Sequence, residues 1–184
     1  MKKSIGIIVG SLRRDSFSKA IARNILNLLP DDFHGEMIEI GHLPLFNQDY
    51  DDDGNTPDSY ILFRQKIKEM DGFLFVTPEY NRSYPAVIKN ALDIASRPYG
   101  QNAWNEKPGA IVSVSPGMLS AFGANHHLRQ VMVFLNIYMM QQPEAYIGNV
   151  DAMLGKDGVV NDDKSQQFLQ SIVDAFGIWV KRFN

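Results

Sequence analysis

A short segment combines hydroxyl groups, guanidinium groups and the start of a helix. Residues 10–20 read GSLRRDSFSKA and directly follow an apolar run. The polar side chains that could bind a ligand here are those of Ser11, Arg13, Arg14, Ser16 and Ser18. Hydroxyl donors and forked cations suit a phosphate group. A helix N-terminus adds unpaired N–H groups and a partial positive charge. The segment therefore predicts a phosphate site.

The glycine pattern limits which phosphate this loop can bind. It lacks the G-x-x-x-x-G-K-[ST] pattern of a nucleoside triphosphate loop and the G-x-G-x-x-G pattern of a dinucleotide site. A terminal monophosphate fits better. The alternative is that the serines only cap the helix and that the arginines are solvated.

A second polar loop, TPEYNRSYP at residues 77–85, follows another apolar run. Tyr80 or Tyr84 could cover a planar ring, and the N–H groups of the turn at residues 80–82 could donate to ring heteroatoms. Glu79 is a candidate acid or base but has no visible partner carboxylate. The alternative is a purely structural loop.

A third loop, SPGMLSAFG at residues 115–123, follows a further apolar run. Ser115 and Gly117 predict a tight turn whose backbone suits the edge of a flat ligand, and Gly123 would allow a second ligand to approach closely. His126 and His127 are adjacent, so they point to different faces of a helix and do not share a metal.

The sequence contains no segment that predicts a metal site. The acidic DDDGN at residues 51–55 lacks the phase of a calcium loop and its glutamate at position twelve, so we expect a solvated turn.

Apolar runs alternate with amphipathic segments along the whole chain. Strands are expected at residues 4–10, 35–40, 72–77 and 109–115, with a shorter fifth strand near Tyr146. A helix is expected from about Ser16, and four more follow the later strands or loops. Continuous apolar strands between amphipathic helices predict a parallel sheet covered on both faces. We therefore expect one domain over residues 1–184, a flavodoxin-like doubly wound α/β fold with five parallel strands in the order 2-1-3-4-5 and three α/β/α layers.

Composition excludes several classes of function. The 184 residues contain no cysteine, which excludes disulfides, cysteine-ligated zinc, iron–sulfur clusters and thiol chemistry. Any redox role must then use a bound organic cofactor. A net charge of −3 speaks against nucleic acid as a partner. There is no apolar run long enough to span a membrane and no apolar core of a signal peptide, so we expect a cytoplasmic protein without membrane partners.

Three segments together resemble one family. GSLRRDSFSKAIA, VTPEYNRSYPAVIKNALDIASRP and GANHHLRQVMVFLN are similar to the NADPH-dependent FMN reductase family, a flavodoxin-like group that includes bacterial quinone, chromate and azo-compound reductases. The similarity runs over about residues 4–183. It implies non-covalently bound FMN, NADPH or NADH as hydride donor, and a homodimer or homotetramer.

The resemblance also implies roles for individual residues. The phosphate contacts fall on Ser11, Leu12, Arg13, Ser16, Phe17 and Ser18. The flavin-ring contacts fall on Pro78, Glu79, Tyr80, Asn81, Ser115 and Gly117. The expected wall of the substrate pocket is Arg82, Tyr84, Tyr99 and Trp104, with residues of a second subunit. Two positions depart from the family pattern: Ser18 stands where asparagine is frequent, and Phe122 stands where glycine is frequent.

The implied activity is two-electron hydride transfer from NAD(P)H through FMN to a quinone or a similar acceptor, such as free flavin, an azo or nitro compound, or chromate. The flavin carries the chemistry, so no catalytic side chain is expected. The alternatives are a non-catalytic FMN electron carrier and a flavin-based redox sensor. Carriers are usually more acidic and have a threonine-rich phosphate loop. Recognition of the 2′-phosphate of NADPH needs a basic residue that only the fold can place.

Overall fold

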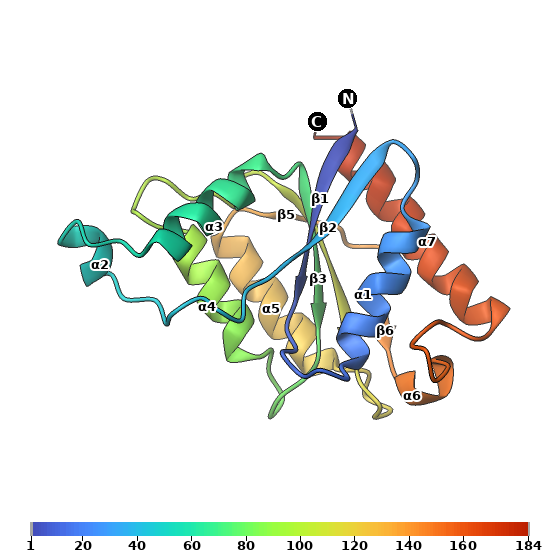
Figure 1. Cartoon of the computed structure of the whole chain (residues 1–184). Helices are drawn as coiled ribbons and strands as arrows, with labels where there is room; N and C mark the ends of the chain where they lie inside the picture. Colours follow the sequence, from blue (N-terminus) through green and yellow to red (C-terminus); the bar gives the residue numbers. More distant parts are fainter. Residues whose placement is uncertain (1, 184) are drawn as a thin grey trace.

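Extended segments from most of the chain form one parallel sheet (Figure 1). The structure, a computed structural model, describes residues 2–183. Its strands are β1 (Lys3–Val9), β2 (Phe33–Ile38), β3 (Gly72–Thr77), β4 (Pro108–Val114), β5 (Tyr138–Met139) and β6 (Ala145–Ile147). The order is β2-β1-β3-β4-β5, and β6 also pairs with β4. Order and parallel direction confirm the prediction.

The position of the fifth strand holds two short strands instead of one. β5 pairs with the start of β4, where Pro108 is opposite Tyr138, and β6 pairs with its end, where Val112 is opposite Ala145. The chain leaves the ladder between them, at a segment containing Pro143, which has no N–H to donate. The predicted strand near Tyr146 is thus only the second half of the fifth position. The five predicted positions are confirmed, and the sheet has six strands because the fifth position is divided.

Two helical layers cover the sheet. The helices are α1 (Phe17–Leu28), α2 (Asp49–Asp52), α3 (Asp58–Glu69), α4 (Ala86–Ala95), α5 (Phe122–Phe134), α6 (Val150–Met153) and α7 (Asp163–Lys181). Successive strand residues alternate between the two faces. Ile5 and Ile7 pack with α1 and α7, whereas Ile8 packs with α3 and α4. Each central strand is therefore apolar on both faces, as the continuous apolar runs predict.

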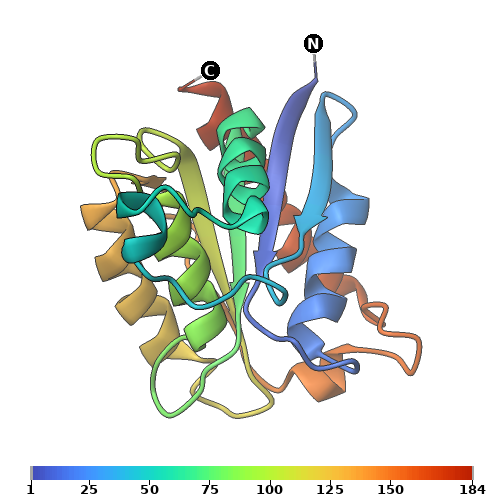
Figure 2. The same cartoon turned by 60° about the vertical axis from the view of Figure 1, so that its left-hand side comes forward.

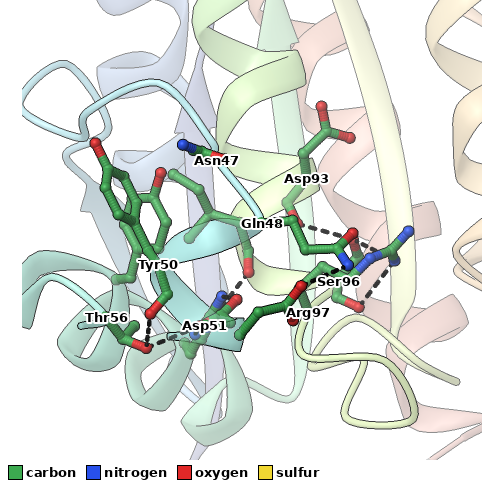
Figure 3. A network of polar contacts seen from close by, with 12 residues as sticks. Asn47, Gln48, Tyr50, Asp51, Thr56, Asp93, Ser96 and Arg97 are labelled. Atoms are coloured by element: carbon green, nitrogen blue, oxygen red, sulfur yellow. Dashed lines mark hydrogen bonds and ion pairs between the residues drawn. The ribbon is translucent and has the colours of Figure 1, made fainter. Parts of the chain in front are cut away.

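The acidic segment after β2 is a solvated turn only in part. It forms α2, which Figure 1 shows outside the α3–α4 layer. Asp51 accepts hydrogen bonds from Nη1 and Nη2 of Arg64 at 2.7 and 2.6 Å, and from Thr56 Oγ1 at 2.9 Å (Figure 3). Arg64 Nε also donates to the carbonyl of Ile94. The prediction of a solvated turn is correct for residues 52–55, which are exposed, and wrong for Asp51, which is an internal ion-pair partner.

The loops that follow β1, β3 and β4 meet at one edge of the sheet. Figures 1 and 2 both show them at the lower edge, whereas the two ends of the chain lie at the upper edge. Parallel strands place their carboxyl ends at the same edge, which is where such sheets bind ligands. Among residues 2–183, no helix is both long and apolar enough to cross a membrane.

Candidate functional site

The loop between β1 and α1 holds hydrogen-bond donors that the rest of the fold leaves unused. Ser11, Ser16 and Ser18 are only 3%, 5% and 2% exposed. Ser16 caps α1, because its Oγ accepts from the N–H of Lys19 at 3.2 Å. The hydroxyls of Ser11 and Ser18, and the backbone N–H groups of residues 11–18, donate to no group within the described part of the chain. No side-chain oxygen of the described residues is both fully buried and unpaired, so these hydroxyls reach the surface of the loop. The cluster of available donors there fits an anion bound at the helix N-terminus.

The charges around this helix end are positive. Arg13 has no ion-pair partner among the described residues, and Arg14 lies 3.6 Å from Asp15 with both side chains exposed. The first turn of α1 contains no acidic residue. Cations near a helix N-terminus are repelled by its partial positive charge. A bound anion would therefore lower the electrostatic energy of this segment.

The first and second loops are direct neighbours. The N–H of Gly10 donates to the carbonyl of Val76 at 2.9 Å. A Cβ on Gly10 would lie 3.1 Å from Cδ of Pro78. A ligand bound to the first loop can therefore reach the second, as the strand order predicts.

The second loop contains a tight turn that leaves two donors unused. Tyr80 and Ser83 exchange N–H···O bonds of 2.8 and 3.0 Å. Asn81 and Arg82 between them have φ values of 51° and 69°, which is the left-handed pair of a type I′ turn. The N–H of Tyr80 is thus already used, so the expectation that this N–H donates to a ring heteroatom is wrong. The N–H groups of Asn81 and Arg82 have no acceptor within residues 2–183.

Glu79 connects the second loop to α5. Its Oε2 accepts from the N–H of Ala124 at 3.0 Å, and its Oε1 lies 3.7 Å from Nη1 of Arg82. Gly123 permits this contact, because a Cβ there would lie 2.9 Å from the carbonyl oxygen of Arg82 and 3.0 Å from Oε2 of Glu79. Gly123 therefore admits the neighbouring turn, not a second ligand as expected, and Glu79 positions that turn.

The third loop uses its own amide donors. Ser115 donates its N–H to the carbonyl of Ile147 at 2.8 Å, and Gly117 donates its N–H to Oγ of Ser115 at 3.0 Å. These two N–H groups already donate within the protein and are not available to a ligand. A ligand would therefore contact the outer surface of the turn. Met118 and Leu119 are exposed at its tip and give this surface an apolar character.

Two of the four expected pocket residues lie elsewhere. Arg82 is exposed on the second loop, and Tyr84 is half-buried there, with a pKa raised by burial. Tyr99 and Trp104 belong to the connection that leads to the amino end of β4, at the opposite edge.

Tyr99 is 94% exposed, whereas Trp104 is fully buried and donates from Nε1 to the carbonyl of Leu92 at 3.0 Å. Trp104 packs edge-on to Phe73. The predictions for Tyr99 and Trp104 are wrong for the site of one chain, because Trp104 is a core residue and Tyr99 faces solvent at the other edge.

An aromatic cluster that lies beside the third loop was not predicted from the sequence. The ring of Phe122 lies 4.2 Å from that of His126 and 5.4 Å from that of Tyr146. His126 Nε2 is 3.0 Å from the Tyr146 hydroxyl, which donates to Oε1 of Glu144 at 2.8 Å. Burial, with Glu144, raises the pKa of Tyr146 to about 12. The spacing of Phe122 and His126 by one helical turn was the only signal, and Tyr146 joins them only through the fold.

A family comparison identifies this combination of fold and loops. The model described as NADPH-dependent FMN reductase matches residues 3–152. The chain belongs to the NADPH-dependent FMN reductase family. It is accordingly a flavodoxin-like oxidoreductase that uses FMN and NAD(P)H.

Relatives within the NADPH-dependent FMN reductase family span the whole chain. A quinone reductase of Pseudomonas putida is 48% identical over 178 residues, which cover 97% of this chain and 95% of the relative. A 2-hydroxy-1,4-benzoquinone reductase of a Burkholderia species is 45% identical, with 98% of each chain covered. Among solved structures, FerB, a flavoenzyme NAD(P)H:(acceptor) oxidoreductase from Paracoccus denitrificans, superposes with a TM-score of 0.92 at 39% identity and 98% coverage of both chains.

Proposed function

We propose that the protein reduces quinones with hydride from NAD(P)H, using FMN bound at the carboxyl edge of the sheet. The observation that carries this proposal is the set of donors at residues 11–18 that make no hydrogen bond within the described chain. Relatives named as quinone reductases, at 45% and 48% identity, support a quinone as the acceptor. FMN, when bound, supplies the hydride-transfer chemistry.

The first loop would hold the phosphate of FMN. Hydroxyl donors come from Ser11 and Ser18, and Arg13 supplies a guanidinium that forms no ion pair within residues 2–183. Ser16 accepts the Lys19 N–H with its Oγ and can still donate its hydroxyl proton. The N–H groups of Leu12 and Phe17 complete the donor set. Charge-assisted hydrogen bonds of this kind are about twice as strong as neutral ones.

The second and third loops would hold the flavin ring. The N–H groups of Asn81 and Arg82 are the available donors, and Pro78, Tyr80 and Ser115 would contribute the surrounding surface. Glu79 fixes the turn against α5, so these donors are aimed before the ligand arrives. Fixed donors of this kind can stabilise charge that develops on a ring without further rearrangement.

Acceptors would bind on the open side of the second loop. Tyr80 and Arg82 are exposed there, and Tyr84 is half-buried behind them. An exposed aromatic ring and a guanidinium both stack on flat molecules. This surface suits a planar quinone, and no side chain needs to act as a general acid.

We also propose a homodimer or homotetramer with a cytoplasmic location. Val133 and Phe134 at the end of α5 are 77% and 81% exposed, which is unusual for neighbouring large apolar side chains and supports self-association. A pyridine-nucleotide donor supports the cytoplasmic location.

Anaerobic stopped-flow mixing tests the proposed activity. The FMN-loaded protein is mixed with NADPH or NADH, and the visible absorbance of the flavin is followed. We expect bleaching without any partner protein, followed by rapid recovery on addition of a benzoquinone. Slower recovery is expected with free FMN, an azo dye, a nitro compound or chromate. A flavin that no nicotinamide bleaches would indicate a carrier or a sensor, and recovery that is slowest with the quinone would exclude it as the preferred acceptor.

A further inference from the structure

A second hollow adjoins the phosphate loop on the side of β2. Its volume is about 260 Å³, and it lies between the first half of α1 and the end of β2. Figures 1 and 2 show these two elements side by side. The hollow shares Ser11 and Leu12 with the phosphate loop. Its rim carries Arg14, Lys19 and Arg23, its floor is apolar, and Glu39 faces it from the end of β2.

The cations of this rim are not explained by ion pairs within the protein. Lys19 and Arg23 have no acid within ion-pair distance in the described chain, and Arg14 has only the exposed Asp15 at 3.6 Å. Lys19 and Arg23 are four residues apart on one helical face, where like charges repel. Lys19 also lies in the first turn of α1, near the positive end of the helix dipole. These repulsions between like charges destabilise the protein when no ligand is bound. A bound anion would replace them with attraction.

The shape and lining limit the kind of anion. Val9, Met37, Ile38 and Ile40 give an apolar floor under a cationic rim. This combination suits a flat apolar base that carries a phosphate. The volume is below the roughly 300–1,000 Å³ of a pocket that encloses a whole drug-sized ligand, so it suits one end of a dinucleotide.

We propose that this hollow receives the adenosine end of NADPH and that Arg14, Lys19 and Arg23 bind its 2′-phosphate. The inference rests on the proposed function, because the nicotinamide of the same molecule must reach the flavin ring at the second and third loops. NADH has a neutral hydroxyl in place of the 2′-phosphate, so the three cations favour NADPH. Glu39 leaves the rim with a net excess of two positive charges and can accept a hydrogen bond from the amino group of the base.

Calorimetric titration of the FMN-loaded protein with adenosine 2′,5′-bisphosphate and with 5′-AMP tests the site without any turnover. The parent protein is expected to bind the bisphosphate at least tenfold more tightly. Lys19→Gln and Arg23→Gln should each weaken bisphosphate binding by about tenfold, equivalent to about 1.4 kcal/mol, and leave 5′-AMP binding unchanged. Arg182→Gln, which removes an exposed cation at the opposite end of the molecule, is the matched control and should change neither affinity.

Steady-state kinetics add a second test. In the double variant Lys19→Gln/Arg23→Gln, kcat/KM should fall at least tenfold for NADPH and stay within twofold for NADH. Equal binding of bisphosphate and 5′-AMP by the parent would overturn the proposal and assign the cations to another anionic partner. Unchanged binding in the variants would overturn it too. Failure of the flavin to be reduced by either nucleotide would refute the proposed function separately, since the titrations need no reduction.

Discussion

Ser11 and Ser18, whose hydroxyls have no partner among the described residues, are the most informative residues of the site. A serine that caps a helix or lies in the core normally hydrogen-bonds within the protein. The Ser16 hydroxyl accepts from the N–H of Lys19, and the Ser113 hydroxyl donates to the carbonyl of Ser120. Ser11 and Ser18 are also only 3% and 2% exposed, but their hydroxyls have no partner among the described residues and are not sealed from solvent. Because these two hydroxyls contribute no hydrogen bond to the fold and lie at a helix N-terminus, they are better explained by an anionic ligand than by the fold.

Ser18→Ala should weaken FMN binding without weakening the fold. A hydrogen bond to a charged group contributes about 1.5–3 kcal/mol, so the Kd for FMN should rise about 10- to 100-fold. Quenching of flavin fluorescence on titration of the FMN-free protein measures this change. Thermal unfolding of the FMN-free variant should match the parent. Ser171→Ala, on the exposed side of α7, is the control and should leave the Kd unchanged. A Ser18 variant with the parental Kd would contradict the phosphate assignment.

Gly123→Ala should disturb the second loop from a position outside it. The new Cβ would lie 2.9 Å from the carbonyl oxygen of Arg82, which is backbone and cannot move cheaply. Overpacking usually costs about 1–3 kcal/mol, which exceeds the helix-propensity gain of about 1 kcal/mol.

The melting temperature should fall by a few degrees, and FMN should bind less tightly, as calorimetry and fluorescence titration can show. Gly117→Ala is the control for stability, because its nearest contact would be an ordinary 3.4 Å. An equally stable Gly123 variant would mean that the turn does not rest on α5 as described.

At the scale of elements, a buried ion pair links α2 to α3 and α4, in addition to the hydrogen bonds that Tyr60 and Asn90 make to the segment after β2. The side chains of Arg64 and Asp51 are only 10% and 6% exposed, and Arg64 also reaches the end of α4. α2 has four residues, none of them buried as a whole, and it contacts the core through the Asp51 side chain and the Tyr50 ring, which packs edge-on against Tyr60. A buried pair of this kind is costly to break, because the remaining charge stays desolvated.

Asp51→Asn should lower the free energy of unfolding by about 3 kcal/mol at neutral pH. Hydrogen bonds from Arg64 lower the pKa of Asp51 below its ordinary value of 3.8. A lowered carboxyl pKa stabilises the fold fully above the unfolded-state value, near pH 4, and this contribution is lost as pH falls toward the folded-state value.

Urea unfolding between pH 3 and pH 7 (roughly the range that brackets this carboxyl) measures the difference between parent and variant. The difference should be constant above about pH 5 and shrink below about pH 4. Asp53→Asn, in the exposed residue after α2, should change stability by less than about 0.5 kcal/mol at any of these pH values. A difference that does not depend on pH would contradict the ionic origin of the effect.

At the scale of the whole molecule, the surface itself predicts association. Val133 and Phe134 lie near the sheet edge formed by β5, which has only β4 as a neighbour. Edge strands and exposed apolar side chains both favour contacts with another chain.

Sedimentation equilibrium should therefore give a mass that is a multiple of the 20.8 kDa chain. The double variant Val133→Ser/Phe134→Ser should shift this mass toward the monomer while its circular dichroism stays unchanged. A monomeric parent protein would refute the proposed oligomer, and a variant with the parental mass would place the interface elsewhere.

Sequence patterns predicted the order of the sheet and the start of α1 because both depend on local features. Strands buried on both faces are continuously apolar, as at residues 72–77, and Ser16 is a helix cap that acts within its own turn. Trp104 and Tyr99 were misplaced because aromatic residues look alike in a sequence whether they line a pocket or a core. The pairing of Asp51 with Arg64, thirteen residues away, left no periodic signal.

The sequence by itself determined the layered parallel fold, the need for an organic redox cofactor, and the segments that form the ligand-binding edge. These properties follow from local periodicity, residue chemistry and the absence of cysteine. Only the tertiary structure decided which donors remain available, that Glu79 supports α5, and that Arg14, Lys19 and Arg23 surround a hollow. Such properties depend on contacts between residues far apart in the chain, and hydrogen bonds and ion pairs act only where folding brings those residues together.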